Sequence, residues 1–201
     1  MAKKTLMVGV LSMVVIAITA AGVWMFGPGG ELRGTAYGEP YPPAPDFELT
    51  SGNGSDVRLS ELRGDIVLLF FGYTSCPDVC PTTMAELKTV TEKLGVQKAR
   101  KVKVLLVTVD PDRDTPQRMQ EYVNHFNKDF IGLTGSDQEL AKVWGDYGIF
   151  REVADEDSAA GYGLDHTARV TLIDQDGNLR ASYGFDTPVD DILHDLNLLL
   201  K

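Results

Sequence analysis

The two cysteines of this chain are separated by three residues, in the segment from Cys76 to Cys80. The segment follows a continuous apolar run of strand length, residues 66–71, and precedes a helix that we predict to begin at Pro81. Free N–H groups and the dipole at a helix N-terminus stabilise anions, so they should lower the pKa of nearby thiols. Thiolates bind soft metal ions and attack disulfides, so Cys76 and Cys80 are candidates for a shared ion or for a disulfide.

Soft thiolates favour Cu(I), with Zn(II) as a competitor. A structural zinc site usually has four protein ligands, whereas the chain offers two cysteines and three histidines. His125 and His194 lie opposite the apolar stripes of their predicted helices, so we expect both to be solvated. His166 lies in a predicted loop and is a candidate third ligand. A loop histidine alone is weak support for a metal site, and a purely structural Cys76–Cys80 disulfide is the alternative.

A second cluster of polar residues resembles a calcium-binding loop. Asp110, Asp112, Asp114 and Glu121 occupy positions 1, 3, 5 and 12 of that pattern. Thr115 stands where the sharp turn requires glycine, and the proline after it starts a predicted helix. We interpret the cluster as a polar loop at the end of a strand, with Asp110 at most bordering the metal site without binding the ion.

The elements around these residues alternate between strand and helix patterns. We predict a hairpin over residues 47–59, strands at 66–71 and 102–109, helices after Pro81, Thr115 and Ser136, a hairpin over 170–183, and a final helix after Pro188. Residues 152–163 are acidic and rich in small residues, so we predict a mobile loop there. The order is typical of an α/β fold with a central mixed sheet flanked by helices, and it is compatible with a thioredoxin-like fold.

The N-terminus predicts a single membrane-spanning helix. Residues 1–4 form a basic stub, and the uncharged stretch within residues 5–26 is long enough, at about 1.5 Å per residue, to cross a bilayer. A cleaved signal peptide is the alternative, but its apolar region is usually shorter. Lys3 and Lys4 should stay in the cytoplasm, which places the rest on the periplasmic side of a bacterial cytoplasmic membrane. Residues 27–45 are rich in glycine and proline and predict a linker to a domain over 46–201.

The formal net charge of −10 argues against one class of partner. An acidic domain repels phosphate backbones, so nucleic acid is not expected to bind.

Three segments resemble the Sco/SenC family: Phe71 to Thr83, Val109 to Pro116, and Asp165 to Thr167. Their order and spacing agree with that family, and the resemblance extends from about residue 45 to the C-terminus. It implies a thioredoxin-like fold and a role in assembling the dinuclear copper centre of cytochrome c oxidase subunit II. It also implies that Cys76, Cys80 and His166 bind copper as Cu(I), Cu(II) or both. Thr171 and Asp174 depart from the family pattern without affecting these ligands.

Several functions remain open at this point. A copper chaperone requires a third ligand, which His166 provides. A thiol–disulfide oxidoreductase that reduces the cysteines of an apo copper site requires only Cys76 and Cys80. A peroxidase of the peroxiredoxin type or a copper or redox sensor is less well supported. The expected partners are the oxidase subunit, a periplasmic copper carrier, a thioredoxin-like reductant and the lipid bilayer.

Overall fold

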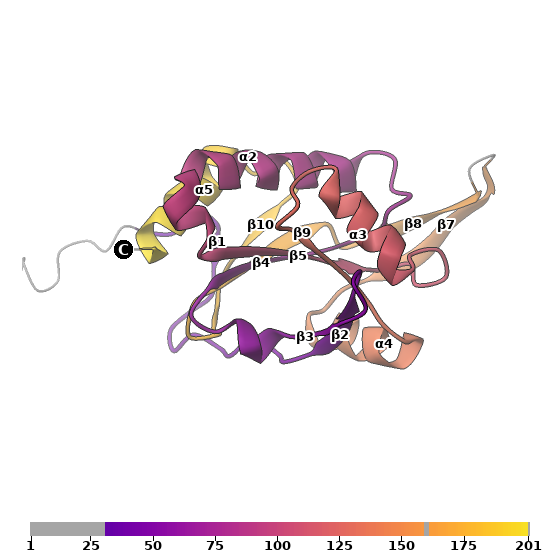
Figure 1. The fold of residues 1–201 in the computed structure, drawn as a ribbon, viewed down its shortest axis with the longest axis horizontal. Coiled ribbons are helices and arrows are strands. Elements are labelled where there is room, and N and C mark those ends of the chain that lie inside the picture. The colour runs from indigo at the N-terminus through magenta and orange to yellow at the C-terminus, as the bar shows by residue number, and fades with distance from the viewer. Residues whose placement is uncertain (1–30, 159–160, 201) are drawn as a thin grey trace, which may run out of the picture. The chain divides into compact units, whose positions relative to one another are not determined.

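The computed structural model describes residues 31–158 and 161–200. Eight strands form a mixed sheet in the order β1-β10-β9-β4-β5-β6-β2-β3, and β7 and β8 form a separate two-stranded sheet (Figure 1). The main strands are β1 (Thr35–Ala36), β2 (Glu48–Ser51), β3 (Asp56–Arg58), β4 (Ile66–Gly72), β5 (Val102–Thr108), β6 (Ile131–Thr134), β9 (Arg169–Ile173) and β10 (Leu179–Gly184). The remaining elements are η1 (Leu59–Leu62), α2 (Val79–Ala99), α3 (Pro116–Asn124), α4 (Asp137–Asp146), α5 (Val189–Leu199), β7 (Arg151–Ser158) and β8 (Gly161–His166).

The centre of the sheet is β4, in which all seven residues are buried. It pairs in parallel with β5 and antiparallel with β9. Figure 1 shows α2, α3 and α5 on one face of the sheet and α4 on the other, so β4 is covered on both sides. That position explains why its sequence is apolar without alternation. The predicted α/β order, the mixed sheet and the hairpin β2–β3 are confirmed.

Local signals in the sequence explain where several helices begin. Thr115 accepts a hydrogen bond from the Arg118 N–H and is followed by proline at the first helical position of α3. Ser136 and Glu139 form the predicted capping box of α4. Helix α2 begins at Val79, two residues before the predicted start, which places Cys80 inside its first turn.

The structure contradicts the predicted loop over residues 152–163. These residues belong largely to the antiparallel pair β7–β8, whose register runs from Arg151 opposite His166 to Ser158 opposite Gly161. Backbone pairing does not require apolar side chains, and one apolar cross-strand pair, Val153 opposite Leu164, lies within the acidic sequence. The strand β6 was also not predicted, because it is only four residues long and contains a glycine.

The structure also differs from the predicted linker over residues 27–45. Strand β1 pairs with β10, and the N–H groups of Arg33 and Gly34 donate to the buried carboxylate of Asp195 at 2.8 to 3.0 Å. The Ala44 N–H donates to the carbonyl of Gly177 at 2.9 Å. Much of the segment is therefore bound to the domain surface from residue 33 onward.

The predicted stub and membrane-spanning helix, residues 1–4 and 5–26, lie outside the described residues. Within residues 31–158 and 161–200, none of the helices combines the length and the apolar composition needed to cross a bilayer. Asp174, one of the two departures from the family pattern, is buried in the turn between β9 and β10. It accepts hydrogen bonds there from the N–H groups of Asp176 and Asn178.

Candidate metal centre

Three elements bring Cys76, Cys80 and His166 together at the carboxyl end of β4. Cys76 lies in the loop between β4 and α2, Cys80 in the first turn of α2, and His166 is the last residue of β8. Their possible ligand atoms all lie within 4.8 Å of one another, and Cys80 Sγ is 3.6 Å from His166 Nε2. Among the described residues, no other group of three histidine, cysteine or acidic side chains is close enough to share one ion.

The distances fit a three-coordinate metal ion. Bonds of about 2.3 Å to a thiolate and about 2.0 Å to an imidazole, at about 120°, place sulfur and nitrogen about 3.7 Å apart. The observed separation of 3.6 Å between Cys80 Sγ and His166 Nε2 is close to that value. Two soft sulfur ligands and one imidazole suit copper, while a structural zinc site would require a fourth protein ligand.

The two thiols differ in environment. Cys80 is fully buried, whereas Cys76 is half-buried, and both are free thiols. The Cys76 sulfur accepts a hydrogen bond from the Cys80 N–H at 3.3 Å, so it caps the N-terminus of α2, where the Asp78 side chain makes no capping bond. Hydrogen bonds from the Cys80 thiol, His166 and backbone N–H groups lower the pKa of Cys76 to about 4. The same bond to Cys76, together with burial, raises the pKa of Cys80. The pair therefore holds one negative charge, on Cys76.

The imidazole of His166 is oriented by contacts with Thr167, Tyr73 and Phe70. Its Nδ1 lies 3.2 Å from the carbonyl oxygen of Thr167, so a proton on Nδ1 would leave Nε2 free to bind a metal. The ring packs edge-on against Tyr73, with centroids 5.7 Å apart, and against Phe70 at 6.5 Å. These contacts hold Nε2 toward Cys80.

The loop after β5 supports the segment that carries Cys76. Asp114 is fully buried and accepts hydrogen bonds from the Thr74 N–H at 3.1 Å, the Thr74 hydroxyl at 2.5 Å and the Thr108 hydroxyl at 2.7 Å. Asp110 is engaged with Arg113 and with the hydroxyl of Tyr162. Both carboxylates are thus committed to protein donors, which agrees with the interpretation of this cluster as a polar loop.

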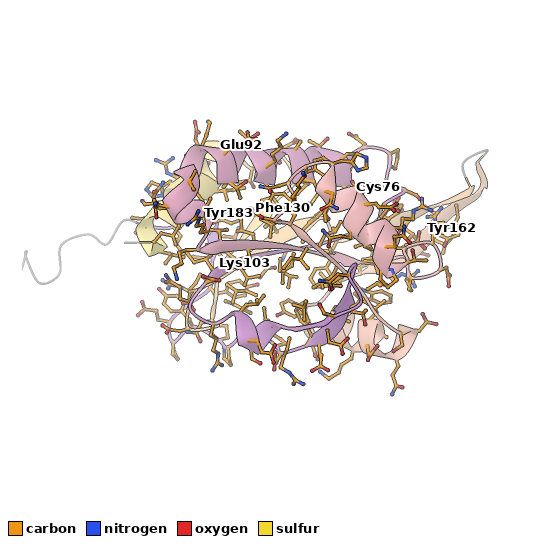
Figure 2. All side chains as sticks on the ribbon, viewed as in Figure 1. Cys76, Glu92, Lys103, Phe130, Tyr162 and Tyr183 are labelled. Atoms are coloured by element: carbon orange, nitrogen blue, oxygen red, sulfur yellow. The ribbon has the colours of Figure 1, made fainter. Side chains whose placement is uncertain are left out.

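A cavity of about 320 Å³ opens beside Cys76 and the imidazole of His166. It is bordered on one side by the loop from Cys76 to Val79 and on the other by the hairpin β7–β8. Figure 2 labels Cys76 and Tyr162 at the same end of the domain, next to this hairpin. The half-buried Cys76 is therefore accessible to a partner that approaches between the loop and the hairpin.

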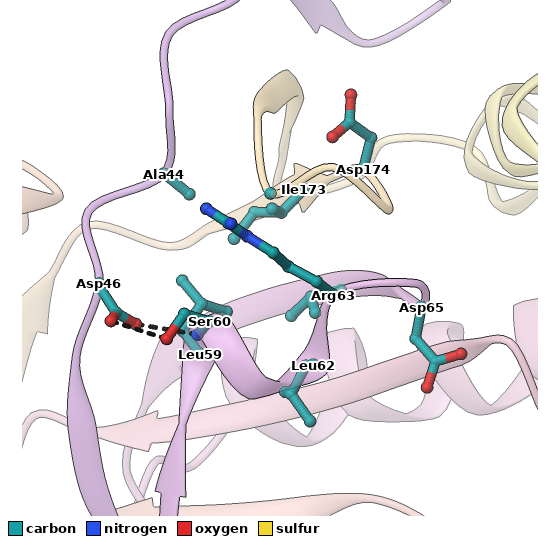
Figure 3. Close-up of a pocket in the computed structure, with 11 residues that line it drawn as sticks. Ala44, Asp46, Leu59, Ser60, Leu62, Arg63, Asp65, Ile173 and Asp174 are labelled. Carbon is teal, nitrogen blue, oxygen red and sulfur yellow. Dashed lines mark hydrogen bonds between the residues drawn. The ribbon is translucent and has the colours of Figure 1, made fainter.

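A different pocket lies at the opposite end of β4, before the strand begins (Figure 3). Its polar lining includes Arg63, Asp65 and Asp46, and the Asp46 carboxylate accepts hydrogen bonds from the backbone and hydroxyl of Ser60 at 2.9 Å. No cysteine or histidine is among the residues that line it. This pocket therefore offers no site for the chemistry that the sequence predicts.

The other two histidines lie outside the cluster. His125 is exposed at the end of α3, as predicted, with Nδ1 2.7 Å from the carbonyl of Glu121. His194 is less exposed than predicted, since its Nδ1 lies 2.9 Å from the carboxylate of the buried Asp195. Sequence reasoning also missed Tyr73, although it lies within the cysteine motif. Its hydroxyl accepts a hydrogen bond from the Leu164 N–H of β8 at 3.2 Å.

Comparisons with known proteins agree with this arrangement. The model of the SCO1/SenC family matches residues 36–201. An SCO2-like protein of Rickettsia felis is 38% identical over 149 residues, which cover 74% of this chain and 72% of that protein. Copper-bound ScoI of Bradyrhizobium japonicum is 36% identical, with a TM-score of 0.71 and coverage of 78% of this chain and 99% of that one. Apo Sco1 of Thermus thermophilus is 36% identical, with a TM-score of 0.76 over 86% of this chain and 99% of that one. The predicted thioredoxin-like α/β fold is confirmed by these matches.

Proposed function

This chain belongs to the SCO1/SenC family, and we propose that it is a copper-binding chaperone that holds its cargo through Cys76, Cys80 and His166. The observation that supports this function most is the convergence of two thiols and one imidazole within 4.8 Å, from three separate elements of the fold. A thiol–disulfide oxidoreductase does not require the imidazole. The copper-bound state of the related ScoI from Bradyrhizobium japonicum supports copper as the ion.

The protein's own residues prepare the site for a metal cation. Cys76 is held as a thiolate by the helix N-terminus and by the Cys80 thiol, so a first sulfur ligand is available without loss of a proton. Cys80 must lose its proton when the ion binds, which makes binding release a proton. His166 presents Nε2 while its Nδ1 faces the Thr167 carbonyl. Oxidation to a Cys76–Cys80 disulfide would remove both sulfur ligands, so we expect copper binding to depend on reduction.

We also propose that the recipient is the dinuclear copper centre of cytochrome c oxidase subunit II, as the family resemblance implies. Under this proposal the chain receives copper from another periplasmic carrier, and a thioredoxin-like protein keeps its cysteines reduced. The apolar stretch within residues 5–26 supports a single-pass anchor that tethers the domain on the periplasmic side. Protease added to spheroplasts should then digest the domain, and recovery of a soluble mature protein that starts near residue 23 would contradict the anchor.

A second function is supported by the pKa of Cys76. A thiolate beside a buried thiol is the arrangement used in thiol–disulfide exchange, so the chain could instead reduce the cysteines of the apo copper site. In that reaction the Cys76 thiolate attacks the target disulfide, and Cys80 then resolves the mixed disulfide. The target gains two electrons from the cysteine pair, one proton from Cys80 and one from solvent, and the chain is oxidised to the Cys76–Cys80 disulfide.

The variant His166→Ala separates the two functions. Exchange needs an attacking thiolate and a leaving group, whereas copper binding uses the imidazole as well. We expect His166→Ala to weaken copper binding, most of all for Cu(II), while the cysteines still oxidise and reduce. Loss of oxidase activity in cells that carry this variant, partly restored by added copper, would support metal delivery. Normal oxidase assembly despite lost copper binding would refute the chaperone function in favour of the reductase.

A further inference from the structure

The hairpin that carries His166 is not part of the main sheet. Strands β7 and β8 pair only with each other among the described elements, and Figure 1 shows them projecting past the end of the eight-stranded sheet. The chain from His166 into β9 fixes the base of the hairpin, but it leaves the tilt of the two strands free. The direction of the His166 side chain therefore depends on contacts between β8 and the rest of the domain.

One residue outside the hairpin contacts β8 in two ways. Arg113, in the loop after β5, donates from Nη1 to the carbonyl of Tyr162 at 2.9 Å. Its guanidinium carbon also lies 3.8 Å from the centre of the Tyr162 ring, a cation–π contact. Tyr162 precedes His166 by four residues on the same strand, so Arg113 binds both the backbone and the side chain of the strand that presents the imidazole.

Asp110 contacts both Arg113 and Tyr162, so the three residues form a closed network. Its carboxylate is fully buried, forms an ion pair with Arg113 Nε and accepts a hydrogen bond from the Tyr162 hydroxyl at 2.6 Å. A buried ion pair with additional hydrogen bonds is rigid, because any movement leaves a charge without a partner. This network of Asp110, Arg113 and Tyr162 therefore fixes Tyr162 relative to the loop after β5.

The same arginine reaches the residues that touch His166. Its guanidinium carbon lies 5.8 Å from the centre of the Tyr73 ring, and Tyr73 packs against the imidazole and accepts the Leu164 N–H. Resting on the copper site proposed above, we infer that Arg113 is a positioning residue, which clamps β8 through Tyr162 and Asp110 so that His166 Nε2 faces the two thiols. Arg113 acts on the third ligand, so it contributes to Cu(II) affinity more than to Cu(I) affinity.

The chain contains a matched control for this inference. Arg180 forms an ion pair with the buried Asp174, Nη1 to Oδ2 at 3.0 Å, and lies 4.0 Å over the ring of Tyr41. Its side chain is 19% exposed, against 20% for Arg113. The two arginines thus share burial, ion pairing and a tyrosine contact, but Arg180 lies in β10, near the turn that follows β9. A general loss of stability should appear in both variants, while an effect on His166 should appear only for Arg113.

The experiment compares Arg113→Met, Arg180→Met, His166→Ala and the double variant Arg113→Met with His166→Ala in the reduced protein. Affinity for Cu(II) and for Cu(I) is measured by competition with chelators, and hydrogen exchange of the Leu164 amide is measured without metal. Loss of a group that orients a ligand typically costs about 10- to 100-fold in metal affinity. We expect Arg113→Met to lower Cu(II) affinity about tenfold, with a smaller change for Cu(I), and to speed Leu164 exchange.

The control and the double variant decide the interpretation. Arg180→Met should keep Cu(II) affinity and Leu164 exchange near those of the wild type. In the His166→Ala background, Arg113→Met should cause no further loss, because its effect acts through the imidazole. If Arg113→Met does not fold, Tyr162→Leu replaces it, since that change leaves the Arg113–Asp110 ion pair in place.

The inference is overturned by wild-type Cu(II) affinity in the Arg113→Met or Tyr162→Leu protein, or by an equal loss of Cu(II) affinity in Arg180→Met. An additive loss in the double variant would also overturn it. Wild-type Cu(II) affinity in His166→Ala alone would instead refute the three-ligand site on which the inference rests.

Discussion

Gly72, the last residue of β4, lies directly behind the buried thiol. A Cβ added at this position would lie 2.9 Å from Cys80 Sγ, 3.1 Å from a ring carbon of Phe70 and 3.3 Å from a methyl carbon of Leu106. The substitution Gly72→Ala therefore pushes on the Cys80 sulfur from β4. Strand geometry accommodates alanine, so the perturbation comes from packing.

The size of the effect follows from the distances. Ordinary contact begins at 3.4 Å, so the sulfur and the added methyl group must separate by about half an ångström. Cys80 and Phe70 are fully buried, and extra methyl groups in such a core typically cost about 1–3 kcal/mol. For a chain of this size, each kcal/mol lowers the melting temperature by about 2–4 °C. A shift of about half an ångström in one ligand is also enough to impair a metal site.

The assay is thermal unfolding of the reduced, metal-free protein, followed by copper affinity. We expect Gly72→Ala to lower the melting temperature by about 2–12 °C and to weaken copper binding. The control is Gly145→Ala in α4, where an added Cβ meets nothing within 4 Å; it should stabilise the helix by up to about 1 kcal/mol and leave copper binding unchanged. Wild-type stability together with wild-type copper affinity in Gly72→Ala would refute the placement of the Cys80 sulfur against β4.

Three further predictions test other contacts. The pKa of Cys76 falls from 9.0 to about 4. Near pH 5 most folded molecules therefore carry a Cys76 thiolate, whereas only about one in 10⁴ unfolded chains does. Even if this thiolate is about 10²-fold less nucleophilic, alkylation of Cys76 should be tens of times faster in the folded protein. That advantage should vanish near about pH 7 and reverse as pH rises toward 9. Equal rates near about pH 5, compared by mass spectrometry, would contradict the thiolate assignment. Tyr73→Phe leaves the buried Leu164 N–H without its acceptor, so urea unfolding should show a loss of about 1–3 kcal/mol; unchanged stability would show that this bond is dispensable. Asp195→Ala removes the acceptor of the Arg33 and Gly34 N–H groups and of the Tyr183 hydroxyl, so limited proteolysis should cut near residues 32–40, and resistance equal to the wild type would contradict that anchor.

The elements near the thiols could be predicted because their signals are local. The apolar run of β4, the capping residues Thr115 and Ser136, and the cysteine spacing each lie within a few residues of the feature that they determine. The hairpin β7–β8 could not be predicted, because backbone pairing holds its strands together and its sequence is acidic, without the apolar pattern of a strand. The hydrogen bonds that hold the chain from residue 33 onward to the domain could not be predicted for a similar reason. A glycine- and proline-rich sequence resembles a linker even where its N–H groups donate to Asp195.

In the candidate site, too, some residues could be predicted from the local sequence and others could not. Only three residues separate Cys76 and Cys80 in sequence, and their position between a strand and a helix predicted that they lie together. That His166 lies beside them could be expected only from the family resemblance, because 86 residues separate it from Cys80. The role of Arg113 depends on Tyr162, 49 residues further along the chain, and no local pattern links the two.

The central claim is that the reduced chain binds one copper ion through Cys76, Cys80 and His166. The most direct test is the copper content of the reduced protein and of the protein oxidised to the Cys76–Cys80 disulfide, with X-ray absorption of the loaded form to identify the ligands. We predict one copper ion per reduced chain, coordinated by two sulfur atoms and one nitrogen atom, and no tight binding after oxidation. Equal copper uptake by both forms, or a spectrum without sulfur ligands, would contradict the account.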